Sequence, residues 1–262
     1  MDRKTKIIAT VGPSLSSEAK INKIIDAGAN VLRINFSHGT LEDHKKVISW
    51  AKKSKKQVAI MQDIQGPKLR TGKSSKNTFL EKSKKITLTN IETESNDDIV
   101  FINYEHLFRD INVEDRVFID DGQIVLKVVE KKNDKLEALI LIGGDLRDNQ
   151  GVAFPDSDLS VSAITNQDIE HLKFGTEHDV DFVAVSFVIN ASDINLVKEL
   201  IPKDVKIIAK IELKTALDNI DEILDIADGV MVARGDLGVQ LPLEQVPFVQ
   251  KQILDAANKR GK

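Results

Sequence analysis

The feature that most constrains the fold is a regular alternation of short apolar runs with amphipathic stretches of helix length. Runs of this length, rich in Ile and Val, predict the buried strands of a parallel sheet. The amphipathic stretches, such as SSEAKINKIIDAGA and PLEQVPFVQKQILDAANKRG, predict helices that close on Gly or a basic residue. This repetition predicts an α/β fold of the (β/α)8 TIM-barrel type, incomplete, with about six βα units present. The six runs are KIIATVG (6–12), NVLRINF (30–36), VAIMQDI (58–64), DFVAVSF (181–187), VKIIAKIE (205–212) and GVMVARGD (229–236).

The alternation breaks between residues 73 and 157. There the pattern changes to short strands and turns, including KITLTN, DIVFINY, RVFIDDGQIVLKVVE and KLEALILIGG, with Asp121-Gly122 as a hairpin turn. We therefore expect a barrel domain in two parts, 1–72 and 158–262. A small β-barrel domain is inserted between them at 73–157, where it can serve as a lid.

Composition excludes several classes of protein. A content of 41% hydrophobic and 30% charged residues, with a net charge of -4, is that of a soluble globular protein. Mild acidity and lysine runs without interleaved aromatics argue against nucleic-acid binding. No apolar run reaches the ~20 residues of a membrane span, and the polar start MDRKTK is no signal peptide, so a cytoplasmic protein is expected. The absence of cysteine removes thiolate sites, and five scattered histidines argue against zinc.

Polar residues mark the carboxyl ends of several predicted strands. Arg33 and Asn35 in the second run, and Ser37 directly after it, stand at alternate positions, which places their side chains on one face. Lys210 and Glu212 share a face at the end of the fifth run. Polar groups are costly in a covered parallel sheet unless they serve a site, so these residues predict a site at the barrel mouth.

The residue types at this mouth favour phosphoryl transfer. Glu212 and Asp236, with neither histidine nor cysteine nearby, form an oxygen donor set that suits Mg²⁺ or Mn²⁺. Arg33 and Lys210, with Arg70 as a further candidate, would surround that metal with positive charge, which is how proteins stabilise a transferring phosphoryl group. Neither a GxxxxGK[ST] nor a kinase-type GxGxxG motif is present.

With these residues in place, the chain resembles the pyruvate kinase family along nearly its whole length. The matching segments occur in the family's order: TKIIATVGP (5–13), AGANVLRINFSHGT (27–40), DIQGPKLRTG (63–72), DDGQIVLKVV (120–129), DFVAVSFV (181–188), IIAKIE (207–212) and GVMVARGDLGVQLP (229–242). The resemblance implies transfer of the phosphoryl group of phosphoenolpyruvate to ADP, giving pyruvate and ATP in glycolysis. It also implies a divalent metal and, for the full-length form, a homotetramer.

The resemblance also assigns roles to individual residues. Lys210 is similar to the catalytic group that stabilises the transferring phosphoryl and the enolate oxygen, and Arg33 to the phosphate clamp. Glu212 and Asp236 resemble the divalent-metal ligands, with Gly235 and Asp236 bordering phosphoenolpyruvate. The nucleotide-contacting positions are Asn35, Phe36, Ser37, His38 and Arg70. The monovalent-cation site comprises Asn35, Ser37, Asp63 and the Ile64 carbonyl.

Two positions depart from the pattern of the family. Lys68 stands where many members carry Glu, so a fixed ammonium can stand in for K⁺ near Asp63, and our hypothesis is that activity does not require K⁺. Gln150 stands where a lysine often reaches the nucleotide, so that contact is weaker or comes from Arg147.

A third departure is the end of the chain at ANKRGK. The resemblance implies that the family continues into a seventh strand, a threonine-bearing segment, an eighth βα unit and a regulatory domain. We therefore expect a fragment or a truncated product, whose open barrel exposes the edge of strand six. Two alternatives remain: a non-catalytic remnant that binds ligands without turnover, or a Mg²⁺-dependent barrel lyase acting on a pyruvate-like substrate. The inserted domain and INFSHGT speak against the lyase.

Overall fold

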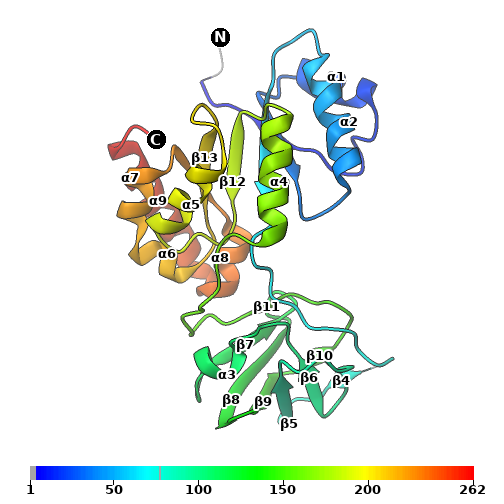
Figure 1. The fold of residues 1–262 in the computed structure, drawn as a ribbon. Helices are drawn as coiled ribbons and strands as arrows, with labels where there is room; N and C mark the ends of the chain where they lie inside the picture. Colours follow the sequence, from blue (N-terminus) through cyan, green and yellow to red (C-terminus); the bar gives the residue numbers. More distant parts are fainter. Residues whose placement is uncertain (1–3, 77) are drawn as a thin grey trace.

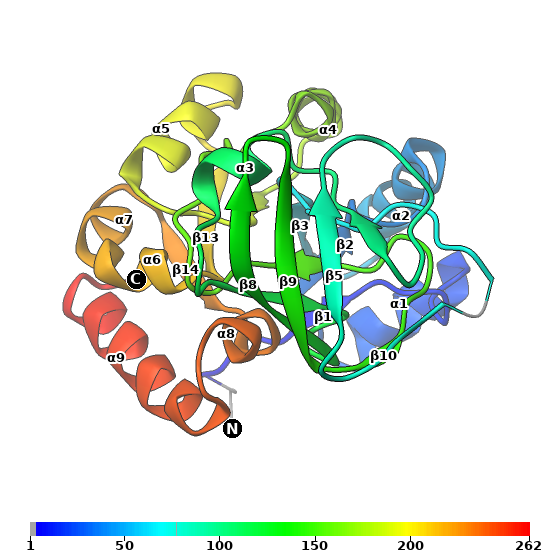
Figure 2. The ribbon, with the colours of Figure 1, turned by 90° about the horizontal axis from the view of Figure 1, so that it is seen from below.

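The parallel sheet contains a strand from every one of the six apolar runs. In this computed structural model, which describes residues 4–76 and 78–262, the strand order is β1-β2-β3-β12-β13-β14 and every neighbouring pair is parallel. The sheet is curled, as a barrel-type α/β fold requires (Figure 2). Within the described residues, β1 and β14 each pair on one side only. The strands are β1 (Ile8–Thr10), β2 (Val31–Asn35), β3 (Ala59–Ile64), β12 (Phe182–Val185), β13 (Lys206–Ile211) and β14 (Gly229–Val232).

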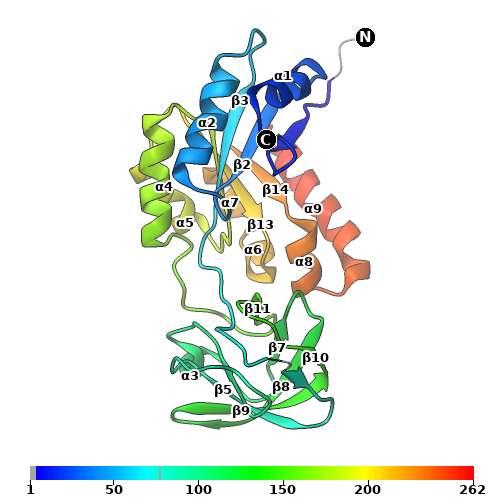
Figure 3. The ribbon, with the colours of Figure 1, turned by 90° about the vertical axis from the view of Figure 1, so that its right-hand side faces the viewer.

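Helices cover the outer face of this sheet (Figures 2 and 3). Leu32 and Ile34 of β2 pack in one core with Ile21 and Ile25 of α1, because alternate strand residues point to the same face. On the inner face of the curl, residues such as Met61 form a small second cluster. The helices are α1 (Glu18–Asp26), α2 (Leu41–Lys52), α4 (Asn166–Glu177), α5 (Ala191–Leu200), α6 (Lys214–Asp218), α7 (Ile220–Ile226), α8 (Arg234–Gln240), the 3-10 turn η1 (Leu243–Gln245) and α9 (Val246–Lys259). In the described part of the chain, no helix is long and apolar enough to cross a membrane.

The end of the sixth run differs from the prediction. The run 229–236 was expected to be a strand, but β14 ends at Val232 and helix α8 begins at Arg234. Leu237 is fully buried and its N–H donates to the Ala233 carbonyl at 2.9 Å, while Asp236 lies in the first helical turn, where the helix dipole favours a negative charge. Asp236 is therefore presented by a helix and not by a strand end.

A second sheet with its own core lies at the carboxyl end of the first (Figure 1). The turn at Asp121 and Gly122 is confirmed: both have left-handed φ angles, 54° and 85°, and the flanking strands pair from Ile119 to Ile124. The sheet order is β11-β7-β8-β9-β5-β6, and β10 pairs with β4. The boundaries at 73 and 157 stay a prediction. The elements are β4 (Phe79–Leu80), β5 (Lys85–Thr89), β6 (Ile99–Phe101), α3 (Leu107–Asp110), β7 (Arg116–Ile119), β8 (Ile124–Lys132), β9 (Lys135–Ile142), β10 (Gly144–Asp145) and β11 (Val152–Ala153).

Both segments that join the two sheets are held by buried carboxylates. On the outgoing segment, the N–H groups of Gln65 and Gly66 donate to Asp168 Oδ1 at 3.1 and 3.3 Å. On the returning segment, the N–H of Ser160 donates to Asp110 Oδ2 at 2.8 Å, and the Tyr104 hydroxyl donates to the same oxygen. These anchors fix where the chain leaves and re-enters the α/β layer.

Candidate active site

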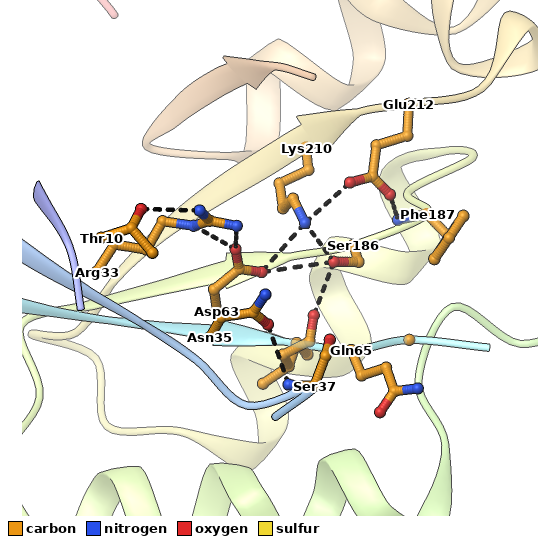
Figure 4. Close-up of polar contacts among 12 residues, drawn as sticks. Thr10, Arg33, Asn35, Ser37, Asp63, Gln65, Ser186, Phe187, Lys210 and Glu212 are labelled. Atoms are coloured by element: carbon orange, nitrogen blue, oxygen red, sulfur yellow. Dashed lines mark hydrogen bonds and ion pairs between the residues drawn. The ribbon is translucent and has the colours of Figure 1, made fainter. Parts of the chain in front are cut away.

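The predicted polar residues converge at the carboxyl ends of adjacent strands (Figure 4). The parallel register pairs Asn35 of β2 with Asp63 of β3, and Val185 of β12 with Ala209 of β13. Residues at matching heights on neighbouring strands therefore reach the same edge of the sheet. The sequence prediction that charges meet at this mouth is confirmed for Arg33, Asp63, Lys210 and Glu212.

Asp63 is the buried centre of the cluster, with a side chain only 1% exposed. Arg33 donates to its Oδ2 through Nε at 2.5 Å and uses Nη1 to reach Thr10 Oγ1 at 3.0 Å. Lys210 Nζ lies 3.2 Å from the other oxygen, Oδ1. A buried carboxylate is costly unless it is paired with positive charge. The buried Asp63 therefore holds the side chains of Arg33 and Lys210 in place.

Lys210 has a complete set of partners. Its Nζ lies 2.7 Å from Ser186 Oγ, 2.9 Å from Glu212 Oε1 and 3.2 Å from Asp63 Oδ1, which matches the number of N–H donors of an ammonium. Burial acts to lower the pKa of Lys210, but the charges of Glu212 and Asp63 outweigh burial and raise that pKa. Lys210 is therefore a fixed positive charge at neutral pH.

Glu212 is held from two sides. Its Oε2 accepts the N–H of Phe187 at 2.9 Å, and its Oε1 faces Lys210. Burial raises the pKa of the Glu212 carboxyl, Lys210 opposes that rise, and the negative charge of Asp236 adds to it; the net direction is upward. Asp236 is thus close enough to repel Glu212, and a cation shared by the two carboxylates would relieve this repulsion.

A cleft of about 360 Å³ opens beside these two carboxylates, between the ends of the two sheets. Its walls carry six acidic residues, Asp121, Asp156, Asp158, Glu212, Asp218 and Asp236, against two lysines, Lys68 and Lys214. Such an excess of negative charge attracts cations. In the described residues no group of three or more His, Cys, Asp or Glu forms a metal cage. A metal held here by Glu212 and Asp236 would have two protein carboxylates as ligands, a set that suits Mg²⁺ or Mn²⁺ because these ions keep water and substrate oxygens as further ligands.

Sequence reasoning missed Ser186 and Phe187 as contributors to the cluster. Ser186 is 3% exposed, and its Oγ accepts from Lys210 and donates to the Ile64 carbonyl at 2.7 Å. A polar residue at the end of the apolar run DFVAVSF was the available signal, the same one that identified Lys210.

The segment after β2 reaches the mouth with only some of its side chains. Asn35 Oδ1 accepts the N–H of Ser37 at 3.0 Å, and His38 is exposed. The ring of Phe36 is buried, 4.1 Å from the ring of His44, so it points into the core and not toward a ligand. Gly235 is exposed at the start of α8, where an added Cβ would meet nothing within 4 Å.

Arg70 is not brought to the cluster. Its Nη1 donates to the carbonyl of Asn149 at 2.7 Å, on the loop between β10 and β11. In this structure the guanidinium braces the second sheet against the segment that leads into it.

The structure also shows where the residues that depart from the family pattern lie. Lys68 is exposed on the cleft wall, and no ion pair between Lys68 and Asp63 is present in the described residues; the cations beside Asp63 are Arg33 and Lys210. Gln150 is buried, and its Oε1 accepts the N–H of Arg147 at 2.8 Å, so it stabilises a loop. The guanidinium of Arg147 pairs with Asp120 at 2.5 Å. Among the residues that the structure describes, β14 pairs only with β13.

Comparison with known proteins gives one consistent family. The family model described as "Pyruvate kinase, barrel domain" matches residues 2–262. A pyruvate kinase of Thermotoga maritima is 44% identical over 96% of this chain, one of Thermococcus litoralis 40% over 99%, and one of Staphylococcus epidermidis 39% over 99%. The chain covers 56%, 56% and 46% of these proteins, respectively, so it spans about half the length of the curated relatives it matches.

Proposed function

This chain belongs to the pyruvate kinase family, and from that premise we propose that the protein carrying it transfers the phosphoryl group of phosphoenolpyruvate to ADP, giving pyruvate and ATP. The observation that carries the proposal is Lys210: a buried ammonium with three fixed partners, beside two carboxylates at the mouth of a cleft. Such a charge can act on a phosphoryl group without reorganising.

The chemistry assigned to each cation follows from its position. Lys210 stabilises the negative charge that spreads over the transferring phosphoryl and forms on the enolate oxygen, because its pKa is raised and it stays protonated. Arg33, held by Asp63 and Thr10, clamps the phosphate of phosphoenolpyruvate. Both side chains are oriented before substrate arrives, which lowers the entropic cost of reaching the reactive geometry.

Glu212 and Asp236 would hold the divalent cation, Mg²⁺ or Mn²⁺. When bound, that ion supplies positive charge to the phosphoryl oxygens. Gly235, beside Asp236, leaves its backbone open to phosphoenolpyruvate because no side chain covers it.

The nucleotide and a monovalent cation are assigned to the same edge. Asn35, Ser37, Asp63 and the Ile64 carbonyl would form the monovalent-cation site. Asn35 to His38 and Arg70 would contact the nucleotide, with Phe36 acting through its backbone because its ring is buried. Arg70 would exchange its bond to the Asn149 carbonyl for one to phosphate.

Lys68 leads to a prediction about K⁺. Lys68 lies on the wall of the cleft. A negatively charged ligand that binds there and extends toward the carboxylate of Asp63 would therefore also contact the positive charge of Lys68. We expect activity in K⁺-free buffer to be within about twofold of activity in KCl, and Lys68→Glu to create a K⁺ requirement. A large stimulation of the wild type by KCl, with NaCl at equal ionic strength as the control, would contradict the hypothesis.

The role proposed here belongs to glycolysis and would place the protein in the cytoplasm. Assembly of the full-length form as a homotetramer stays a prediction.

The experiment that tests the function is a coupled assay of ATP and pyruvate formation from phosphoenolpyruvate and ADP. Lys210→Met is expected to lower kcat by ~10²-fold or more and to leave phosphoenolpyruvate binding within a few-fold, the scale of a lost transition-state donor. Lys214→Met, on α6 at the same cleft, is the matched control and should stay within a few-fold. Carbon–carbon cleavage without ATP would favour a lyase, and ligand binding without turnover a non-catalytic remnant.

A further inference from the structure

Two consecutive residues directly after β12 hold Lys210 of β13 and Glu212, which follows that strand. The register that pairs Val185 with Ala209 continues to place Ser186 beside Lys210. Ser186 Oγ accepts from Lys210 Nζ at 2.7 Å, and the N–H of Phe187 donates to Glu212 Oε2 at 2.9 Å (Figure 4). The second contact comes from the backbone, so the backbone conformation of Phe187 decides whether it exists.

That conformation is unusual for an aromatic residue. Phe187 has a φ of 55°, in the left-handed region that bulky side chains avoid. If Phe187 returned to negative φ between the same fixed chain ends, the preceding peptide plane would have to rotate, and the N–H would turn away from Glu212. Strained backbone of this kind persists only where the surroundings hold it, and it occurs often at functional sites.

The ring of Phe187 supplies that support. It packs against Gly66, where an added Cβ would lie 3.0 Å from Phe187 Cδ2 and 3.3 Å from the Ser186 carbonyl. Gly66 itself has a φ of 68° and is fixed by its N–H bond to Asp168. The space above Gly66 therefore seats the ring and keeps Phe187 left-handed.

We infer that Phe187 is a positioning residue for the divalent-metal site: its left-handed backbone directs its N–H at Glu212 and thereby fixes the plane of that carboxylate toward the cleft. This inference rests on the proposed function, in which Glu212 and Asp236 bind the metal.

The test compares two variants that lose the same ring. Phe187→Gly keeps the left-handed conformation at little cost, whereas Phe187→Ala does not. Mn²⁺ binding to the purified protein is measured by electron paramagnetic resonance of the free ion, without substrates. We expect Phe187→Ala to bind Mn²⁺ about fivefold to thirtyfold more weakly than Phe187→Gly, the range that corresponds to the left-handed penalty. Equal binding, or weaker binding by Phe187→Gly, would overturn the inference and leave only a packing role.

A second pair covers the case in which the alanine variant does not fold. Asn tolerates left-handed φ, and β-branched Val resists it. Phe187→Asn should therefore bind Mn²⁺ more tightly than Phe187→Val, whereas a packing role predicts the reverse.

The variant Glu212→Gln distinguishes failure of this inference from failure of the proposed metal site. Loss of Mn²⁺ binding in that variant shows that the measured ion occupies the proposed site. If the wild type does not bind Mn²⁺, or Glu212→Gln still does, the proposed metal site is wrong and the inference falls with it. If the site is upheld and the Ala and Gly variants are equal, the inference alone is wrong.

Discussion

At the scale of single residues, Ser186 helps to fix the position of the Lys210 ammonium. Its hydroxyl accepts from Lys210 at 2.7 Å and donates to the Ile64 carbonyl at 2.7 Å, so it links the proposed catalytic lysine to the proposed monovalent-cation site. Without Ser186, Lys210 keeps only its two carboxylate partners, Asp63 and Glu212, and is drawn toward them.

We therefore predict that Ser186→Ala lowers kcat by about tenfold or more, the scale of one hydrogen bond to a charged group, and leaves the KM for phosphoenolpyruvate within about threefold. Steady-state kinetics measure both. Ser162→Ala is the matched control, since Ser162 bonds locally to Ile164 on the segment that joins the sheets. A kcat equal to that of the control would refute the positioning of Lys210 by Ser186.

Two histidines next to the Asn35–His38 segment predict acid sensitivity. The ring of Phe36 lies between His44 on α2, at 4.1 Å, and His171 on α4, at 5.1 Å. Burial lowers the pKa of both imidazoles below 6.5; the proximity of His171 lowers that of His44 further, while Asp43 opposes it, and Asp168 and Glu170 oppose the shift of His171.

These lowered pKa values make the free energy of unfolding depend on pH. The folded protein binds protons at both rings less readily than the unfolded chain, which takes them up near pH 6.5, so this stabilisation is present above that pH and is lost as the pH falls below it. The free energy of unfolding in urea should fall between pH 7.5 and 5.5. The double variant His44→Gln, His171→Gln should lose less over that interval, and an identical loss would contradict the assignment.

At the scale of elements, the sequence predicted which strand residues share a face near the site, but it did not predict where helix α8 begins. The alternating pattern correctly placed Arg33 and Asn35 on one face of the sheet, and likewise Lys210 and Glu212, because a strand's period of two is a local property. The contact between Ser186 and Lys210 depends on the register of β12 against β13, which no local pattern encodes. The sequence pattern placed Asp236 in a strand, whereas the structure places it in helix α8. The burial of Leu237 favours that helix, and this burial is a tertiary contact that no local pattern reveals.

The two capping boxes of α2 and α4 offer a matched comparison. Thr40 with Asp43 caps α2, and Thr165 with Asp168 caps α4 by the same reciprocal bonds. Asp43 is exposed and serves only its helix. Asp168 is 1% exposed and also accepts from two N–H groups of the segment leading to the second sheet.

Asp43→Ala should therefore cost about 1 kcal/mol of unfolding free energy, as for a lost cap. Asp168→Ala should cost about 2 kcal/mol or more in addition, because it leaves the partly buried Gln65 N–H and the buried Gly66 N–H without their acceptor. Urea denaturation measures both variants. Equal losses would show that the bonds to the connecting segment contribute nothing.

At the scale of the whole molecule, the described residues form two large hydrophobic cores that share no residue. One joins the parallel sheet to its helices, and the other lies within the second sheet. Sequence reasoning could locate the change in pattern near 73 and 157, because strand length and turn residues are local signals. It could not locate the anchors between the layers, since Asp110, Tyr104 and Ser160 are brought together by tertiary structure. Neither could it foresee that Arg70 turns to the Asn149 carbonyl.

Separate cores predict separate stability, which a pair of core truncations can test. Leu126 on β8 and Ile207 on β13 are both at most 1% exposed, one in each core. Truncation of either to Ala should cost about 2 to 5 kcal/mol. If the inserted region 73–157 opens as its own unit, Leu126→Ala will speed hydrogen exchange of the β7, β8 and β9 amides and leave β3, β12 and β13 protected, and Ile207→Ala will do the reverse. If each variant instead accelerates exchange in both sheets equally, the anchors make the chain one cooperative unit, and the predicted boundaries have no thermodynamic meaning.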